Sequence, residues 1–176
     1  MFLNKTKLFL IISISLIFFL LTYNDVKSNG NYKISGLAIV VDGDTIKING
    51  EKIRFSGIDA PESYYKGKEQ ICMKEEEKIA CGKLSKNFLI KKINNQKIMC
   101  QIEAKTDRYN RKLGECFVNN QSLSRILVKN GFAFDYPRYS KKKFSKEQEY
   151  AKNNNLGLWN MKFEFPWDFR KKNRNL

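Results

Sequence analysis

Residues 45–48 and 51–55 each alternate apolar and polar side chains, and Asn49-Gly50 separates the two runs. Alternation with a period of two is typical of a strand with one buried face, and Asn-Gly between such runs is typical of a type I′ hairpin turn. The sequence therefore predicts an antiparallel hairpin. Because a two-residue turn fixes the pairing register, Thr45 is expected to face Arg54.

Further patterns predict additional strands and helices after this hairpin. Apolar residues at helical spacing indicate a helix over residues 82–94. Residues 97–103 and 113–118 fit two strands around a turn centred near residue 108. Two more helices are expected, one capped by Ser122 and one opened by a capping-box sequence at Ser145.

The segment of residues 64–80 is polar and charged without a clear period, so we expect an exposed loop there. Gly157 is expected to end the last helix. Short strands with interposed helices indicate a mainly β fold with helices, of the α+β class. The ingredients fit an OB-fold, a five-stranded Greek-key barrel, here with three α-helices.

Three carboxylates and an arginine are predicted to gather at the hairpin and the loop that follows it. Arg54 lies beside Asp44 in the expected register, and Asp59 and Glu62 flank Pro61, which stiffens the loop. Carboxylate oxygens suit a hard divalent cation, and a guanidinium fork suits phosphate oxygens. Taken alone, the motif DGD could instead be an Asp-Gly turn with a surface ion pair and no bound ligand. The whole constellation favours a cation and phosphate site.

The charge of the chain indicates an anionic partner. Its 176 residues carry a formal net charge of +15, which favours nucleic acid or an anionic surface, although a lysine-rich composition is a second explanation. The chain contains no histidine. Schemes that use histidine as a base, a triad member or a zinc ligand are therefore excluded, and hydrolysis must rely on carboxylates, arginines, tyrosines and a metal.

The four cysteines are Cys72, Cys81, Cys100 and Cys116. An even number in an exported chain indicates disulfides. A hairpin symmetric about residue 108 places Cys100 opposite Cys116, so we predict that pair and, with it, Cys72–Cys81. Free or metal-binding thiols are the alternative, although no CxxC spacing is present.

Residues 1–30 differ in character from the rest, because two lysines precede an apolar stretch over residues 8–21. This pattern is typical of a secretory signal that engages the export machinery, and retention as a membrane anchor is the alternative to cleavage. We expect a secreted or periplasmic monomer. The expected organisation has one domain over residues 31–160 and a solvated basic C-terminal extension over residues 161–176.

Four motifs, read together, resemble the staphylococcal-nuclease-like, or thermonuclease, family. They are VDGDT at 41–45, RFSGIDAPE at 54–62, TDRYNR at 106–111 and SLSRILVKNG at 122–131. They occur in the order found in that family, and the resemblance extends over about residues 34–159. It implies an OB-fold and a calcium-dependent phosphodiesterase that cuts DNA and RNA and leaves 3′-phosphates.

The resemblance also implies a calcium site. Asp44 and Asp59 would supply carboxylate ligands and Ala60 a backbone carbonyl, with Asp42 behind them in a second shell. Members of the family often have threonine at the position of Ala60. Because the ligand there is main chain, alanine is not expected to abolish the site.

The catalytic roles are assigned by the same resemblance. Glu62 matches the carboxylate usually given as general base, and Arg54 and Arg111 match the two phosphate-binding arginines. Tyr109 and Tyr139 match tyrosines near the nucleotide.

Two other functions compete with this one. A non-catalytic OB-fold module would hold single strands in a basic groove without cutting them. Such a module is expected to lack one or more of the five charged residues, and all five are present here: Asp44, Arg54, Asp59, Glu62 and Arg111. A structural protein of the cell envelope would explain export and charge but not the carboxylates.

Overall fold

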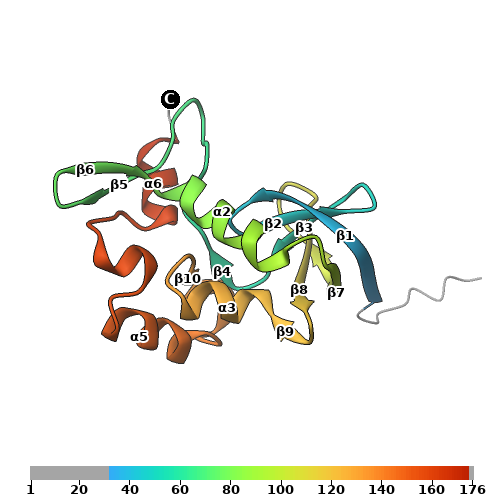
Figure 1. Ribbon diagram of the computed structural model, residues 1–176. Helices are drawn as coiled ribbons and strands as arrows, with labels where there is room; N and C mark the ends of the chain where they lie inside the picture. Colours follow the sequence, from blue (N-terminus) through green and yellow to red (C-terminus); the bar gives the residue numbers. More distant parts are fainter. Residues whose placement is uncertain (1–31, 175–176) are drawn as a thin grey trace, which may run out of the picture. The chain divides into compact units, whose positions relative to one another are not determined.

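The computed structural model describes residues 32–174, and at its centre a sheet closes on itself (Figure 1). Parallel pairing of the third strand with the eighth closes an otherwise antiparallel sheet. The result is a five-stranded barrel with helices, the α+β, OB-like class predicted from the sequence. The barrel strands are β1 (Tyr32–Asp42), β2 (Thr45–Ile48), β3 (Glu51–Phe55), β7 (Lys97–Thr106) and β8 (Lys112–Val118).

The β2–β3 hairpin has the predicted turn and register. Asn49 and Gly50 both have positive φ, 50° and 88°, as a type I′ turn requires. Thr45 faces Arg54. The alternating isoleucines of this hairpin are fully buried, whereas the Arg54 side chain is directed to the other face and reaches a pocket. The hairpin therefore serves the core and the candidate site at once.

Two helices cover the barrel. Helix α2 (Cys81–Ile93) packs against β1 and buries Leu89, and α3 (Leu123–Lys129) buries Leu127 in the same core (Figure 1). Ser122 caps α3 as predicted, because its hydroxyl accepts a hydrogen bond from the Arg125 amide at 3.3 Å. These contacts fix the loops that leave the hairpin.

A short strand pair positions one predicted ligand. Strand β4 (Ile58–Asp59) pairs with β10 (Phe134–Asp135), and Phe134 lies opposite Asp59. Asp59 is therefore held on regular backbone at the barrel edge. The remaining short elements are β9 (Gln121–Ser122), α4 (Pro137–Ser140) and the 3-10 helix η1 (Gly157–Asn160).

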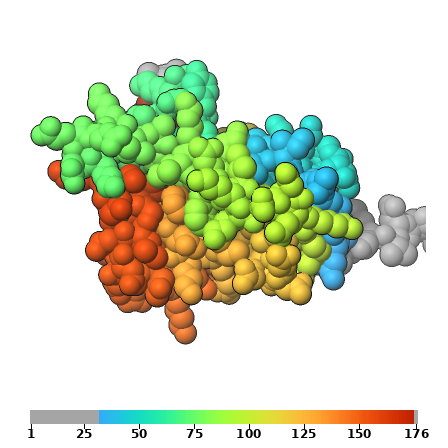
Figure 2. All heavy atoms as spheres, in the orientation of Figure 1, coloured from blue at the N-terminus to red at the C-terminus, as the bar shows by residue number. Residues whose placement is uncertain are grey.

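The prediction of an exposed loop over residues 64–80 was wrong in part. Strands β5 (Ile71–Lys74) and β6 (Glu77–Ala80) form a hairpin there, and the Met73 amide donates to the Lys162 carbonyl at 2.9 Å. The pattern gave no signal, because most side chains of this hairpin stay exposed or half-buried instead of alternating with a core face. Figure 2 shows this green region beside the orange-red segment that follows α5.

Two details of the last predicted helix were also wrong. Helix α5 (Ser145–Asn153) follows Phe144 and has no side-chain cap, so the capping box does not form. Burial of Phe144 in the core sets where the helix begins. The helix ends at Asn153, and Gly157 opens η1 instead of ending α5.

Both predicted disulfides are present. Cys100 faces Cys116 across β7 and β8, and Cys72 is joined to Cys81 at the base of the β5–β6 hairpin. The described residues contain no free cysteine. The Cys100–Cys116 bond lies in the barrel core and links strands β7 and β8 covalently.

Removal of that bond is expected to destabilise the barrel. The double variant Cys100→Ala/Cys116→Ala should lose about 2–4 kcal/mol of unfolding free energy, because the unfolded chain gains the freedom that the bond removes. Urea unfolding followed by circular dichroism measures the loss. A change under about 0.5 kcal/mol contradicts a structural role for the bond.

The end of the chain differs from the solvated extension expected for it. Residues of this segment form helix α6 (Pro166–Lys172), which begins with a proline at its first position, and both Pro166 and Phe169 are buried. The apolar side of α6 therefore packs on the domain.

The N-terminal signal or anchor expected over residues 1–30 lies outside the described residues. Within residues 32–174, the helices are all too short or too polar to cross a membrane.

Candidate active site

Arg54 joins two buried aspartates. Its Nη1 donates to Asp44 Oδ1 at 2.8 Å and its Nη2 donates to Asp59 Oδ1 at 2.5 Å. Asp44 is 3% exposed and Asp59 is fully buried. The opposite charges and hydrogen bonds offset the cost of burying each ion. The burial of Arg54 opposes ionisation, but the two carboxylates outweigh it and raise the pKa of its guanidinium. The group stays charged.

Backbone contacts bring the two aspartates close to Ala60. The Ala60 amide donates to Asp44 Oδ2 at 3.0 Å. The chain reversal at Gly43 passes so near Ala60 that a Cβ on Gly43 would lie 2.8 Å from the alanine Cβ. Glycine at this position therefore allows the turn to approach the loop that carries the second aspartate.

Asp42 supports the neighbouring loop. Its Oδ1 accepts hydrogen bonds from the Gly43 amide at 2.8 Å and from the Ser63 hydroxyl at 2.7 Å. Burial, followed by the charge of Asp44, raises the pKa of Asp42 above its ordinary value. Asp42 thus ties the first turn to the residue that follows Glu62.

Packing and hydrogen bonds hold the backbone of Glu62. Its amide donates to Gln70 Oε1 at 3.0 Å, and the Gln70 side chain also donates to the Glu164 carbonyl at 2.8 Å. At the start of α2, a Cβ on Gly82 would lie 2.1 Å from the Glu62 carbonyl oxygen, so only glycine fits. The loop cannot move without disturbing α2.

Arg170, from helix α6, forms ion pairs with two of the carboxylates. Its Nη2 donates to Asp59 Oδ2 at 2.6 Å, and its Nη1 donates to Glu62 Oε1 at 2.5 Å and to Asp59 Oδ1 at 3.1 Å. Burial of Arg170 is unfavourable for its charge, but these bonds and charges raise its pKa further above the ordinary value. A third arginine therefore belongs to the cluster.

The pKa of Glu62 lies above its ordinary value. Burial, opposed by the hydrogen bond from Arg170 and reinforced by the charge of Asp44, raises the pKa of Glu62 from 4.5 to about 7. A carboxylate with a pKa near neutrality has the basicity that suits proton transfer at that pH.

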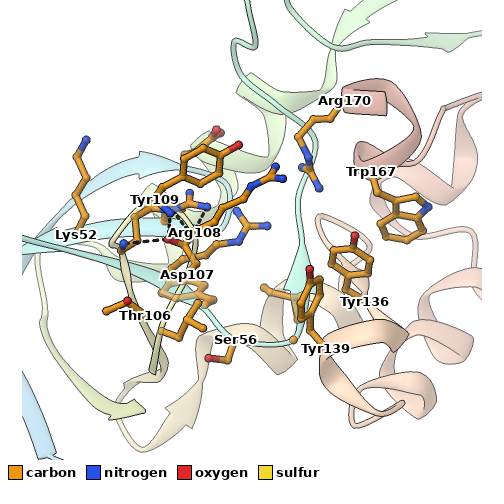
Figure 3. Close-up of a pocket in the computed structure, with 18 of the residues that line it drawn as sticks. Lys52, Ser56, Thr106, Asp107, Arg108, Tyr109, Tyr136, Tyr139, Trp167 and Arg170 are labelled. Atoms are coloured by element: carbon orange, nitrogen blue, oxygen red, sulfur yellow. Dashed lines mark hydrogen bonds and ion pairs between the residues drawn. The ribbon is translucent and has the colours of Figure 1, made fainter. Parts of the chain in front are cut away.

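A pocket of about 780 Å³ opens above the carboxylates. Arg54, Glu62, Arg111 and Arg170 all line it, and Figure 3 shows Arg170 projecting into it from α6 toward the wall that carries Tyr109. The two aspartates lie beneath, in the protein. The pocket thus presents several guanidinium groups to a ligand, together with acidic residues that include Glu62.

The wall contributed by the turn between β7 and β8 is organised by Asp107. Asp107 Oδ1 accepts from the amides of Tyr109 and Arg111, each at 2.9 Å, and Oδ2 accepts from Arg111 Nε at 2.7 Å. Partial burial raises the pKa of Asp107, but the bonds from the Arg111 and Tyr109 groups outweigh it and hold the pKa below its usual range. The guanidinium carbons of Arg108 and Arg111 lie over the Tyr109 ring, 4.7 Å and 5.3 Å from its centroid.

The opposite wall is aromatic. Tyr139 is 64% exposed, and its ring meets Tyr136 edge to face with centroids 4.8 Å apart. Tyr136 in turn stacks on Trp167, from α6, at 4.9 Å (Figure 3). Exposed aromatic rings beside guanidinium groups are a suitable surface for nucleobases.

The donor set matches the chemistry of a hard cation. Asp44, Asp59 and the Ala60 carbonyl are oxygen donors on two neighbouring turns, which are the ligands calcium prefers. Within residues 32–174, no three acidic or cysteine side chains converge to hold an ion. Arg54 bridges the two aspartates. Two carboxylates and a main-chain carbonyl match calcium in the kind of donor they offer, and Arg54 and Arg170 pair with those carboxylates in this structure.

The predicted site residues come together only in part through direct contact. Arg54 contacts both Asp44 and Asp59, and Arg170 links Glu62 to Asp59. Arg111, Tyr109 and Tyr139 reach the same pocket from separate elements. Arg170 and Trp167 were not predicted as site residues from the sequence. Their only sequence signal is the proline that opens a short amphipathic stretch with Phe169.

For the phosphodiester cleavage that the resemblance implies, Asp107→Asn is expected to lower the rate by about tenfold, because Arg111 then loses its anchor and the turn loses its charge-assisted bonds. Kinetics on a single-stranded oligonucleotide measure this. Asp168→Asn, on an exposed part of α6, makes the same change of charge and serves as the control. Equal rates for the two variants contradict the role of Asp107.

The barrel and the basic pocket above two buried aspartates define an OB-like protein with a site for an anionic ligand. The family model of staphylococcal nuclease homologues matches residues 52–161, and the chain belongs to this family. The match includes Arg54, Glu62 and Arg111 and ends before Arg170.

Several relatives carry names that describe their roles. A probable staphylococcal-like nuclease of Oryza sativa, CAN3, is 31% identical over 82% of this chain and 34% of its own length. Endonuclease YhcR of Bacillus subtilis is 34% identical over 74% of the chain and 12% of its own length. Succinoglycan biosynthesis protein ExoI of Rhizobium meliloti is 34% identical over 72% of the chain and 64% of its own length. The chain thus spans less than two thirds of each.

Proposed function

We propose that this chain is a calcium-dependent nuclease that hydrolyses phosphodiester bonds in DNA and RNA and leaves 3′-phosphates. Family membership and the nuclease names of relatives support nucleic acid as the substrate. The observation that carries the proposal is the shared pocket. Glu62, Arg54 and Arg111 line one cavity above the two aspartates, so a base and two phosphate-binding groups face one ligand.

Each side chain has a role that follows from its position. Glu62, with its raised pKa, accepts a proton from the attacking water or orients that water. Arg54 and Arg111 bind the phosphate and offset the charge that grows as water adds. Calcium held by Asp44, Asp59 and the Ala60 carbonyl would supply a Lewis acid for a nonbridging phosphate oxygen.

Substrate nucleotides would lie between the two pocket walls. Tyr109 and Tyr139 present more than half of their surfaces, 58% and 64%, and lie on opposite sides of the pocket (Figure 3). Each offers a ring face or edge to a base beside the scissile phosphate. The surrounding arginines attract the backbone charge.

The place of action is part of the same proposal. A charged and then apolar N-terminus together with two disulfides supports export to an oxidising compartment.

End-group analysis tests the reaction. The purified full-length chain is incubated with 5′-labelled single-stranded DNA or RNA and calcium, and the products are treated with a phosphatase. Products that lose a 3′-phosphate confirm the proposed cleavage. Salt-sensitive binding without any product supports the single-strand-binding module instead, and 3′-hydroxyl products contradict the assigned chemistry.

A further inference from the structure

Helix α6 is firmly attached to the loop that carries Glu62. The fully buried Gln70 side chain joins the Glu62 amide to the Glu164 carbonyl, two residues before α6 begins. Lys68 Nζ donates to Asn173 Oδ1 at 3.2 Å near the end of the helix. The helix and the loop therefore form one unit, held on both sides of Arg170.

The Arg170 guanidinium uses three of its N–H groups on carboxylates. Two of these bonds reach both oxygens of Asp59, so the guanidinium is held as a bidentate fork. The remaining bond holds Glu62 at Oε1. Within residues 32–174, no group of the chain donates to Glu62 Oε2.

This arrangement fixes the position of a general base more precisely than a single ion pair would. A carboxylate on a free side chain samples several rotamers, and most of them do not face the substrate. Fixing one oxygen on a guanidinium leaves the second oxygen in a defined place beside the pocket. Precise placement of a catalytic group is worth orders of magnitude in rate.

We propose that Arg170 is a positioning residue of the active site, which fixes the Glu62 carboxylate from an anchor on Asp59 and makes helix α6 a required part of the catalytic unit. This proposal rests on the nuclease function given above. It assigns Arg170 no bond to the substrate, because the observed bonds go to Asp59 and Glu62.

A double-mutant cycle tests the proposal. The full-length wild type, Arg170→Gln, Glu62→Gln and the double variant are compared on a single-stranded oligonucleotide with calcium. Arg170→Gln is expected to lower kcat about thirtyfold with KM within about threefold of wild type, and to change kcat less than about threefold in the Glu62→Gln background. Loss of the effect in that background shows that Arg170 acts through Glu62.

Other outcomes overturn the proposal in distinct ways. An undiminished effect in the Glu62→Gln background, seen mainly in KM, means that Arg170 binds the phosphate directly. A calcium Kd from titration calorimetry that tightens at least about tenfold in Arg170→Gln, with activity kept, means that Arg170 is only a competing cation. Absence of cleavage by the wild type overturns the nuclease function itself.

Controls separate positioning from folding. Lys172→Gln removes one charge from an exposed position on the same helix and should leave kcat and the unfolding free energy unchanged. Arg170→Ala should regain several-fold of its rate with millimolar guanidinium chloride, but not with sodium chloride. Circular dichroism must show that Arg170→Gln is folded. Failure of guanidinium to restore any rate to folded Arg170→Ala overturns the positioning role.

Discussion

Arg54→Ala is expected to lower nucleic-acid cleavage by about a thousandfold, because a phosphate-binding group aimed at developing charge is lost. The same change should lower the free energy of unfolding by about 3 kcal/mol, because Asp44 is buried and keeps no cation partner among the described residues once Arg54 is gone. Urea unfolding and oligonucleotide kinetics on the same samples measure both.

Two variants sharpen this result. Lys47→Ala removes a charge from an exposed position on the same hairpin and should change neither quantity by more than about 0.5 kcal/mol. Arg54→Lys should recover little, because an ammonium cannot bridge Asp44 and Asp59 as the guanidinium fork does. Full activity in Arg54→Lys contradicts the bridging role.

Glu62→Gln is expected to lower kcat by about 10²- to 10⁴-fold, the usual contribution of a general base. The same substitution should stabilise the calcium-free protein above neutral pH. Burial makes the ionised carboxylate unfavourable in the folded state despite the bond from Arg170, and glutamine carries no charge there. Activity and stability should therefore change in opposite directions.

The pH dependence of that gain follows from the raised pKa. The folded protein holds the Glu62 proton up to about pH 7, while the unfolded chain releases it near 4.5. The contribution of this bound proton to the free energy of unfolding is therefore fully present below pH 4.5 and is lost as the pH rises through 7. The advantage of Glu62→Gln should grow over this interval to about 3 kcal/mol, at about 1.36 kcal/mol for each of the roughly 2.5 pKa units between 4.5 and 7.

Thermal unfolding in chelator at pH 4.5 and pH 8 measures the effect. Glu164→Gln, which removes a carboxylate outside the ion pairs that Arg54 and Arg170 form, is the control and should show no such trend. A Glu62→Gln variant that is less stable than wild type at pH 8 would show that the carboxylate is stabilising as an ion.

The local sequence pattern was sufficient to predict the parts of the site that lie on one hairpin. Asn49-Gly50 fixed the register of β2 and β3, so the neighbourhood of Arg54 and Asp44 followed from sequence. The pairing of Cys100 with Cys116 followed in the same way from β7 and β8. Both results rest on contacts close in the sequence, where turn geometry leaves few alternatives.

Contacts between distant segments left no such signal. Arg170 is 111 residues from Asp59, and its position depends on how α6 docks. The sequence of a basic C-terminal stretch is similar whether that stretch is solvated or packed on the domain. Here only Phe169 and Pro166, which are buried, indicate packing. The capping box at Ser145 failed for a related reason, because burial of Phe144 overrode a local preference.

The most direct test of the account is digestion of single-stranded DNA by the purified full-length chain in three reactions: with calcium, with excess chelator, and with calcium and the Glu62→Gln variant. Rapid cleavage is expected in the first reaction, and at least about 99% of the rate should be lost in the other two. Cleavage that survives both the chelator and the substitution would contradict the proposed mechanism.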